Sequence, residues 1–243
     1  MPPAGVMFCF PSVSRGIVLA ADVESLPELR SLASLSVGVP QVAGIKVGFS
    51  LALRHGLPAV VAAVKNVTAL PVIYDHQKAA TDIPAMGHPF AEVCREAGVS
   101  GVILFPQAGP RTLEAFAAAV IEKKMTPIVG LTMTHPAYLQ KDGGFISDTA
   151  PDEIAAIARN LGVRSFVLPG NKAEVIARYG KGPLLPIAPA EILMPGIGTQ
   201  GGSLAEAFKA ADPHRPFAII GSAVYKASDP AAALIGFARE VGQ

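Results

Sequence analysis

Residues 42–48 read Val42-Ala43-Gly44-Ile45-Lys46-Val47-Gly48, a short apolar run followed at once by a segment of helical periodicity over residues 50–66. The run is continuously apolar rather than alternating, which is typical of a strand buried on both faces of a parallel sheet. Lys46 is the one charged residue in this run. The stretch therefore predicts one strand–helix unit that carries a cationic group near the end of its strand.

The same pattern recurs along the chain. The predicted strands are residues 16–22, 42–48, 72–75, 101–105, 127–132, 165–169, 192–197 and 217–221, and the predicted helices are residues 25–36, 50–66, 83–98, 110–124, 151–161, 171–179, 203–211 and 230–241. Eight strands that alternate with eight helices predict an α/β fold, a closed (β/α)8 TIM barrel. An open doubly wound sheet is the alternative architecture. No shift of composition divides the chain, so we expect one barrel domain over residues 1–243.

Composition excludes several classes of function. The 243 residues carry 20 basic and 19 acidic side chains, and 51% of the residues are apolar. A chain this apolar can form a large core, and its net charge of +1 argues against a nucleic-acid partner. No apolar run reaches the length of a membrane span, so we expect no membrane partner. Cys9 and Cys94 are the only cysteines and no signal peptide is recognised, which together predict a cytoplasmic protein.

Charged residues gather where the second and third predicted strands end, the edge that carries the active site in (β/α)8 barrels. Asp75, Lys78 and Asp82 follow the third strand, and Lys46 lies in the second. Two lysines and two aspartates can form a charge-balanced array in which each carboxylate keeps the lysines protonated and one proton is available for catalysis. Because the group lacks histidines or further carboxylates, we predict no metal site. A surface patch of ion pairs is the alternative interpretation.

A glycine-rich segment follows the seventh strand. It reads Gly196-Ile197-Gly198-Thr199-Gln200-Gly201-Gly202 and precedes a predicted helix. The G-x-G-x-x-G pattern is a weak sign of a dinucleotide fold, and its place after the seventh strand argues against one. Glycines let a backbone approach an anion, and barrel loops after strands seven and eight commonly bind phosphate. We therefore predict a phosphate site here, completed by Gly221 and Ser222; a turn that needs glycines only for steric reasons is the alternative.

Taken together, four segments resemble the orotidine 5′-phosphate decarboxylase family. They are Lys46-Val47-Gly48, the Asp75…Lys78…Asp82-Ile83-Pro84 group, Thr132-Met133-Thr134-His135-Pro136 and Pro195-Gly196-Ile197-Gly198-Thr199-Gln200-Gly201-Gly202. The resemblance runs from the first strand to the eighth. It implies decarboxylation of orotidine 5′-monophosphate (OMP) to uridine 5′-monophosphate (UMP) and CO2 in pyrimidine biosynthesis. It further implies a nucleotide substrate, no cofactor, and a homodimer with shared active sites.

The resemblance also implies roles for particular residues. Lys46 would contact the ribose and hold Asp75, which would lie beside the carboxylate of the substrate. Lys78 would be the general acid, and Asp82 would reach into the partner's site. The residues implied to bind substrate are Asp22 for the ribose, Thr134 for the pyrimidine, and Gln200, Gly201, Gly221 and Ser222 for the phosphate.

This sequence departs from the family pattern in places. Each gap of the family's Asp-x-Lys-x-x-Asp motif is one residue longer here, Met86 stands where a threonine is frequent, and Ser222 stands where the family usually has an arginine. Lys172, after the sixth strand, is a candidate replacement cation. The alternatives to the decarboxylase are a related sugar-phosphate decarboxylase and a catalytically impaired barrel that binds a phosphate ligand. His76, next to Asp75, has a structural or a catalytic role, whereas His135 is expected to be a turn or packing residue.

Overall fold

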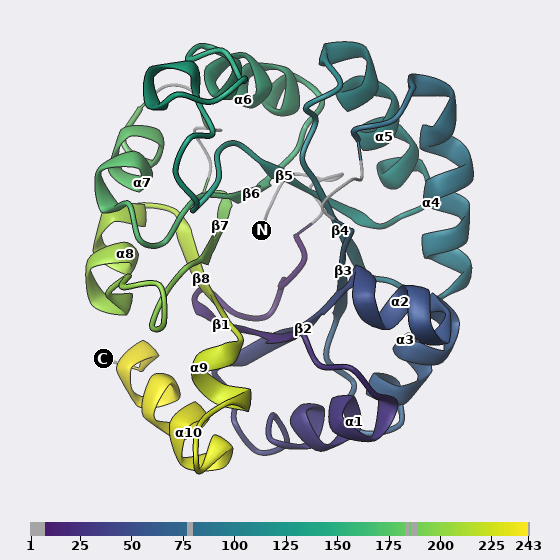
Figure 1. Cartoon of the computed structure of the whole chain (residues 1–243), viewed down its shortest axis with the longest axis vertical. Coiled ribbons are helices and arrows are strands. Elements are labelled where there is room, and N and C mark those ends of the chain that lie inside the picture. The colour runs from purple at the N-terminus through teal and green to yellow at the C-terminus, as the bar shows by residue number, and fades with distance from the viewer. Residues whose placement is uncertain (1–7, 77–79, 183–184, 186–188, 243) are drawn as a thin grey trace.

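The computed structural model describes residues 8–76, 80–182, 185 and 189–242, so Lys78 lies outside the described residues. Eight parallel strands form a closed ring in sequence order, and the helices surround the ring (Figure 1). The first strand also pairs with the eighth, through Gly16–Leu19 and Phe217–Ile220. The predicted TIM barrel is confirmed, and the open sheet is wrong because the first and last strands pair.

The elements follow the predicted order closely. The strands are β1 (Gly16–Ala21), β2 (Val42–Gly48), β3 (Val72–Asp75), β4 (Gly101–Leu104), β5 (Thr126–Gly130), β6 (Ser165–Val167), β7 (Glu191–Pro195) and β8 (Arg215–Ile220). The helices are α1 (Leu26–Ser34), α2 (Phe49–His55), α3 (Leu57–Lys65), α4 (Gly87–Glu96), α5 (Pro110–Glu122), α6 (Ala150–Asn160), α7 (Ala173–Gly180), α8 (Leu204–Ala211), α9 (Ser222–Tyr225) and α10 (Pro230–Val241). Two short 3-10 turns are η1 (Pro84–Met86) and η2 (Gln140–Asp142).

Three helices differ from the prediction. The segment 50–66 is two helices, α2 and α3, because Gly56 adopts a φ of +78° and breaks the helical path. The segment 83–98 opens with the 3-10 turn η1 before α4 begins. The four-residue helix α9 was not predicted at all.

Alternation along the strands decides which side chains face the barrel interior. Ile45 and Val47 belong to the apolar cluster between the strands and the helices, so Lys46 between them faces inward. Tyr74 belongs to the same outer cluster, and the next residue, Asp75, therefore points into the barrel. Lys46 can therefore occur in the otherwise apolar strand β2 because its side chain points into the barrel interior, toward the cavity at the barrel mouth.

The floor of the barrel is closed by the segment before β1. Phe10 packs on Phe217 with ring centroids 4.5 Å apart, within an inner cluster that fills the barrel. Glu191 is fully buried, and its carboxylate accepts hydrogen bonds from the backbone N–H groups of Cys9 and Phe10, each at 2.9 Å. Arg215 lies 3.4 Å from the same carboxylate and donates to the Phe10 carbonyl. These contacts hold the chain segment against the amino ends of the strands.

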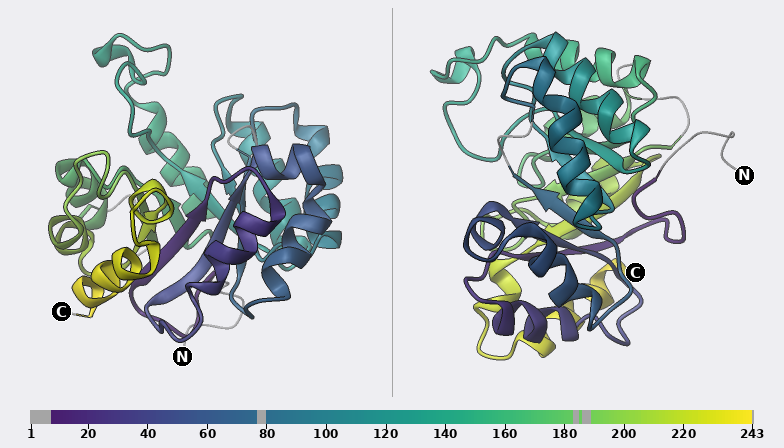
Figure 2. Two further views of the ribbon diagram at one scale, coloured as in Figure 1. Left: turned by 60° about the horizontal axis from the view of Figure 1, so that its bottom comes forward. Right: turned by 90° about the vertical axis from the view of Figure 1, so that its right-hand side faces the viewer.

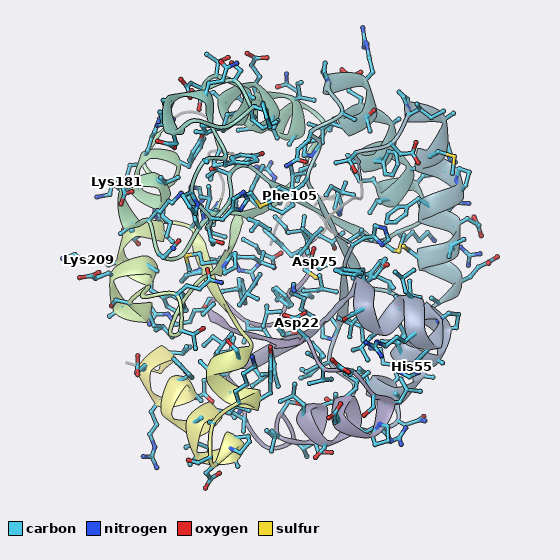
Figure 3. All side chains as sticks on the ribbon, in the orientation of Figure 1. Asp22, His55, Asp75, Phe105, Lys181 and Lys209 are labelled. Carbon is cyan, nitrogen blue, oxygen red and sulfur yellow. The ribbon has the colours of Figure 1, made fainter. Side chains whose placement is uncertain are left out.

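The rest of the molecule frames the opposite end. Figure 3 shows Asp22, Asp75 and Phe105 near the barrel axis, whereas His55, Lys181 and Lys209 lie at the periphery. The connection from β5 to α6, which includes η2, projects from the body of the molecule (Figure 2). Within the described ranges, no helix has the length and apolar character needed to cross a membrane.

Candidate active site

A cavity of about 420 Å³ opens at the carboxyl ends of the strands. All eight strands, or the loops directly after them, contribute to it. The lining residues are Ala20, Asp22, Lys46, Asp75, Ile103, Phe105, Thr132, Met133, Thr134, His135, Val167, Pro195, Gly196, Ile197, Thr199, Gln200, Ile219, Gly221, Ser222 and Tyr225. The cavity therefore lies where the strand ends predicted it.

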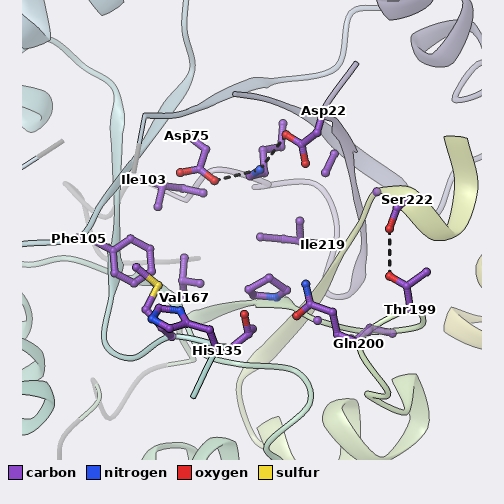
Figure 4. A pocket seen from close by; sticks show the side chains of 18 of the residues that line it. Asp22, Asp75, Ile103, Phe105, His135, Val167, Thr199, Gln200, Ile219 and Ser222 are labelled. Carbon is purple, nitrogen blue, oxygen red and sulfur yellow. Dashed lines mark hydrogen bonds and ion pairs between the residues drawn. The ribbon is translucent and has the colours of Figure 1, made fainter. Parts of the chain in front are cut away.

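One part of the cavity wall holds a cluster of charged side chains (Figure 4). Lys46 Nζ lies 3.0 Å from Asp75 Oδ2 and 3.6 Å from Asp22 Oδ1. The Asp75 side chain is 5% exposed, whereas Asp22 is 49% exposed and faces the opening. The lysine thus bridges a buried and an accessible carboxylate, so the Lys46–Asp75 pair is not a surface ion pair.

The surroundings fix the protonation of Lys46 and of a nearby phenol. Burial by itself lowers the pKa of Lys46, but the carboxylates of Asp75 and Asp22 outweigh burial, and the pKa is raised above its usual value. Burial, and next the Asp22 carboxylate, raise the pKa of Tyr225. At neutral pH the cavity therefore presents a charged ammonium and a neutral phenol.

The loop after β7 forms a compact turn at the cavity edge. Gly198 N–H donates to the Gly202 carbonyl at 3.1 Å, and Gly202 N–H donates to the Gly196 carbonyl at 3.1 Å. Gly196, Gly198 and Gly201 have φ values between +83° and +92°, which favour glycine. A Cβ on Gly202 would lie 2.7 Å from the Gly196 carbonyl oxygen. Steric constraints therefore require glycine at these positions. The turn that the glycines allow brings Thr199 and Gln200 to the cavity.

Apolar side chains make up another part of the wall. Ile103, Phe105, Val167 and Ile219 face the cavity (Figure 4). Phe105 reaches its position because Gly130 has no side chain: a Cβ there would lie 2.3 Å from the Phe105 ring. An apolar surface beside a buried ion pair suits a ligand that has both a ring and polar groups.

Comparisons with known proteins agree with this geometry. Residues 15–236 match the sequence model of the family described as "Orotidine 5'-phosphate decarboxylase / HUMPS family". The chain belongs to this family. An orotidine 5′-phosphate decarboxylase of Pyrococcus furiosus is 32% identical over 215 residues, which span 88% of this chain and 92% of that protein. The enzyme class predicted from the sequence, a carboxy-lyase, is confirmed at the level of the family.

Solved structures of the orotidine 5′-phosphate decarboxylase family share the fold. The protein from Methanocaldococcus jannaschii, crystallised with the inhibitor BMP, superposes with a TM-score of 0.80 at 22% identity, over 94% of this chain and 99% of its own. The protein from Pyrococcus horikoshii OT3 superposes with a TM-score of 0.77 at 28% identity, over 93% of this chain and 99% of its own. The barrel is thus common to the family.

Most family site positions predicted from the sequence meet in the cavity. Asp22, Lys46, Asp75, Thr134, Gln200, Gly221 and Ser222 all line it, whereas Gly201 does not. Asp82 is exposed and outside the cavity, and its Oδ1 accepts the Ile83 N–H at 2.7 Å. The predicted role of Lys78 falls outside the described residues.

Thr199 and Tyr225 are among the lining residues that were not predicted as site residues. Thr199 stands inside the glycine-rich motif, so its place in that motif was the available signal. Tyr225 follows the eighth strand by five residues, and nothing in the sequence distinguishes it from a core residue of a helix.

The histidines and Lys172 have distinct surroundings. His76 Nδ1 is hydrogen-bonded to the Tyr74 hydroxyl and its ring packs edge-on against Phe90, so it lies on the helix side of β3 and does not line the cavity. His135 lines the cavity and also packs against Tyr138. Lys172 Nζ donates to the Met133 carbonyl at 3.2 Å and is not among the lining residues.

Proposed function

We propose that this chain decarboxylates OMP to UMP and CO2, in the formation of pyrimidine nucleotides in the cytoplasm. The observation that carries the proposal is the buried Lys46–Asp75 ion pair in the barrel mouth of a chain that belongs to this family. A nucleotide fits the surroundings: polar groups for a ribose and a phosphate stand beside an apolar wall for a base. The reaction needs a proton donor and no cofactor.

The chemistry assigns a role to each charged group. Loss of CO2 leaves a carbanion on the pyrimidine ring, and a positioned ammonium stabilises that charge and then protonates the carbon. We assign this proton transfer to Lys78. Asp75 lies beside the substrate carboxylate in this proposal, and Lys46 holds Asp75 while it contacts the ribose with Asp22.

Binding groups distant from the reacting carbon complete the proposal. Thr134 contacts the pyrimidine, and Gln200, Gly221 and Ser222 hold the phosphate, whereas the Gly201 N–H donates to the Gly198 carbonyl within the loop. Rate enhancements of about 10¹⁷ require roughly 23 kcal/mol of barrier reduction, more than one proton donor supplies. Binding energy from the phosphate and ribose is therefore expected to contribute to catalysis.

The first test is turnover. Purified protein in buffer with EDTA is mixed with OMP, and the loss of orotate absorbance is followed in the ultraviolet. We expect turnover in the wild type, none in Lys78→Ala, and wild-type rates in Lys65→Ala, whose ammonium donates to the Leu70 carbonyl far from the cavity. Equal rates in the two variants would refute the role of Lys78.

The same assay separates the alternatives. Ser222 in place of an arginine favours a barrel that binds a phosphate ligand without turnover, and absence of turnover together with tight UMP binding would establish that function instead. Turnover of a keto-sugar phosphate without turnover of OMP would establish the sugar-phosphate alternative.

The proposed homodimer has its own test. Asp82 is exposed outside the cavity of its own chain, beside the exposed apolar side chains of Ile83 and Met86, and this supports a role at a subunit interface. If Asp82 serves the partner's site, inactive Asp82→Asn and inactive Lys78→Ala chains should regain part of the activity when their subunits exchange. Demonstrated exchange without recovery would refute the shared site.

A further inference from the structure

The cavity is charged on one side and neutral on another. In the described part of the chain, Lys46 carries the only ammonium or guanidinium group among the lining residues, and Asp22 and Asp75 carry the carboxylates. The wall formed by the loops after β7 and β8 presents hydroxyl, amide and backbone groups instead, from Thr199, Gln200 and Ser222. Figure 4 shows these side chains along the edge away from Asp75.

Two hydroxyls on that neutral wall are bonded to each other. Thr199 Oγ1 lies 3.0 Å from Ser222 Oγ, so the bond joins the loop after β7 to the first residue of α9 (Figure 4). Each hydroxyl has one proton and two lone pairs, and their mutual bond uses only one of the two protons. The pair therefore keeps one O–H donor for an anion while the bond between the two hydroxyls stays intact.

Among the described lining residues, a dianionic phosphate has its favourable surroundings on one side. The carboxylates of Asp22 and Asp75 repel a second negative charge, and Lys46 already lies within 4 Å of both. The neutral wall instead supplies hydroxyl, amide and backbone donors to the several acceptor oxygens of a phosphate. A ligand with an anion at one end is thereby oriented with that end toward β7 and β8.

We propose that the Thr199–Ser222 hydroxyl pair determines how this chain recognises the phosphate of its nucleotide: by neutral hydrogen bonds, without an ion pair. The proposal rests on the proposed function, and it adds Thr199 as a specificity-determining residue. Neutral hydrogen bonds act at short range and are weakly affected by salt, unlike contacts between exposed charges. Phosphate recognition in this chain should therefore be modest in strength and nearly independent of ionic strength.

The experiment compares UMP with uridine by isothermal titration calorimetry on the full-length protein. Thr199→Val and Ser222→Ala each remove one hydroxyl, and Thr199→Ser and Ser222→Thr are the matched controls that retain it. We expect each hydroxyl deletion to weaken UMP binding about threefold to tenfold, the usual value of one neutral hydrogen bond, and to change uridine binding less than twofold. Each control should bind UMP more tightly than the matching deletion, and circular dichroism should show every variant folded.

A gain of function provides the second readout. Ser222→Arg should tighten UMP binding about tenfold or more and make it fall steeply between 50 and 500 mM NaCl, because a guanidinium forms charge-assisted bonds to phosphate. The wild-type ratio of UMP to uridine affinity should change less than twofold over the same range.

Three results would overturn the proposal. UMP affinity that is unchanged in both Thr199→Val and Ser222→Ala refutes the hydroxyl pair. A larger loss in Lys172→Met than in either hydroxyl variant assigns the phosphate to Lys172 instead. Wild-type binding of UMP no tighter than of uridine refutes phosphate recognition altogether. The proposed function fails separately, on absence of OMP turnover, so the two failures are distinguishable.

Discussion

Lys46 shows how much one residue can reveal about a site. Its place inside an apolar strand marked it in the sequence, and the alternation of β2 turns it inward to contact Asp75 at 3.0 Å and Asp22 at 3.6 Å. A buried ammonium is unfavourable unless carboxylates compensate it, and here two do. The two carboxylates therefore compensate the buried ammonium, and the contact fixes the arrangement of Lys46 and Asp75 in the site.

Replacement of Lys46 should measure what these contacts contribute to stability. Lys46→Met removes the 3.0 Å ion pair with the buried Asp75, so we expect the free energy of unfolding to fall at pH 7, by at most about 3–5 kcal/mol. Because the pKa of Lys46 is raised in the folded protein, its contribution is complete below about pH 10.4 and is lost as the pH rises through the folded pKa. Urea denaturation from pH 7 to pH 11 should therefore show the wild type and the variant converging at alkaline pH.

The exposed Lys65→Met variant is the control, and it should lie within about 0.5 kcal/mol of the wild type. A loss in Lys46→Met no larger than in this control would contradict the assigned ion pairs.

At the scale of elements, the loop after β7 depends on close backbone packing. Gly202 lies against the carbonyl oxygens of Gly196 and Gly170, at 2.7 and 2.8 Å from the place of a Cβ. Both obstacles are backbone atoms, which cannot rotate away as a side chain can. The loop that presents Thr199 and Gln200 can therefore pack this closely only because residue 202 has no Cβ.

Gly202→Ala should therefore push this loop away from β6. We expect the free energy of unfolding to fall by about 1–3 kcal/mol, the usual range for overpacking, and UMP binding to weaken with it. Gly236→Ala in α10 is the matched control, because nothing lies within 4 Å of its Cβ position and it should gain about 0.4–1 kcal/mol. Urea titration and calorimetry with UMP measure both, and unchanged UMP affinity in Gly202→Ala would show that the loop does not hold the ligand.

The element pattern could be predicted because eight strands are apolar and buried on both faces. The break at Gly56 was missed because a single glycine within a long helical pattern is tolerated more often than it ends a helix. Helix α9 has four residues, too few to show periodicity. Seven of the proposed site residues line the cavity because they lie at or just after strand ends, which the sequence pattern could locate. The place of Tyr225 in the cavity and the Thr199–Ser222 bond depend on how separate loops lie relative to one another. A pattern of neighbouring residues does not contain that information.

For the whole molecule, Glu191 joins parts of the chain that are far apart in sequence. Its carboxylate accepts the Ser165 hydroxyl at 2.6 Å in addition to the amides of Cys9 and Phe10. Burial raises the pKa of Glu191, although those hydrogen bonds and Arg215 act in the opposite direction. The contacts that close the floor of the barrel therefore converge on the carboxylate of Glu191.

Glu191→Gln should destabilise the whole fold. The amide cannot accept both backbone N–H groups and it leaves Arg215 without its carboxylate, so we expect a loss of about 3 kcal/mol. A raised folded pKa means that the contribution from Glu191 titration is complete below about pH 4.3 and is lost as the pH rises through the folded pKa. The wild-type advantage over the variant should therefore be larger at pH 4 than at pH 8 in chemical denaturation.

The exposed Glu240→Gln variant is the control for this series. An equal advantage at both pH values would contradict the raised pKa of Glu191.

The closed floor of the barrel determines how a ligand enters and leaves the cavity. The inner cluster, from Phe10 and Phe217 upward, fills the interior between the floor and the cavity. A nucleotide must then enter and leave through the same mouth, so it has to depart before the next molecule can be admitted. Product that stays bound in the cavity competes with incoming substrate. The rate of product release therefore sets an upper limit on the turnover rate.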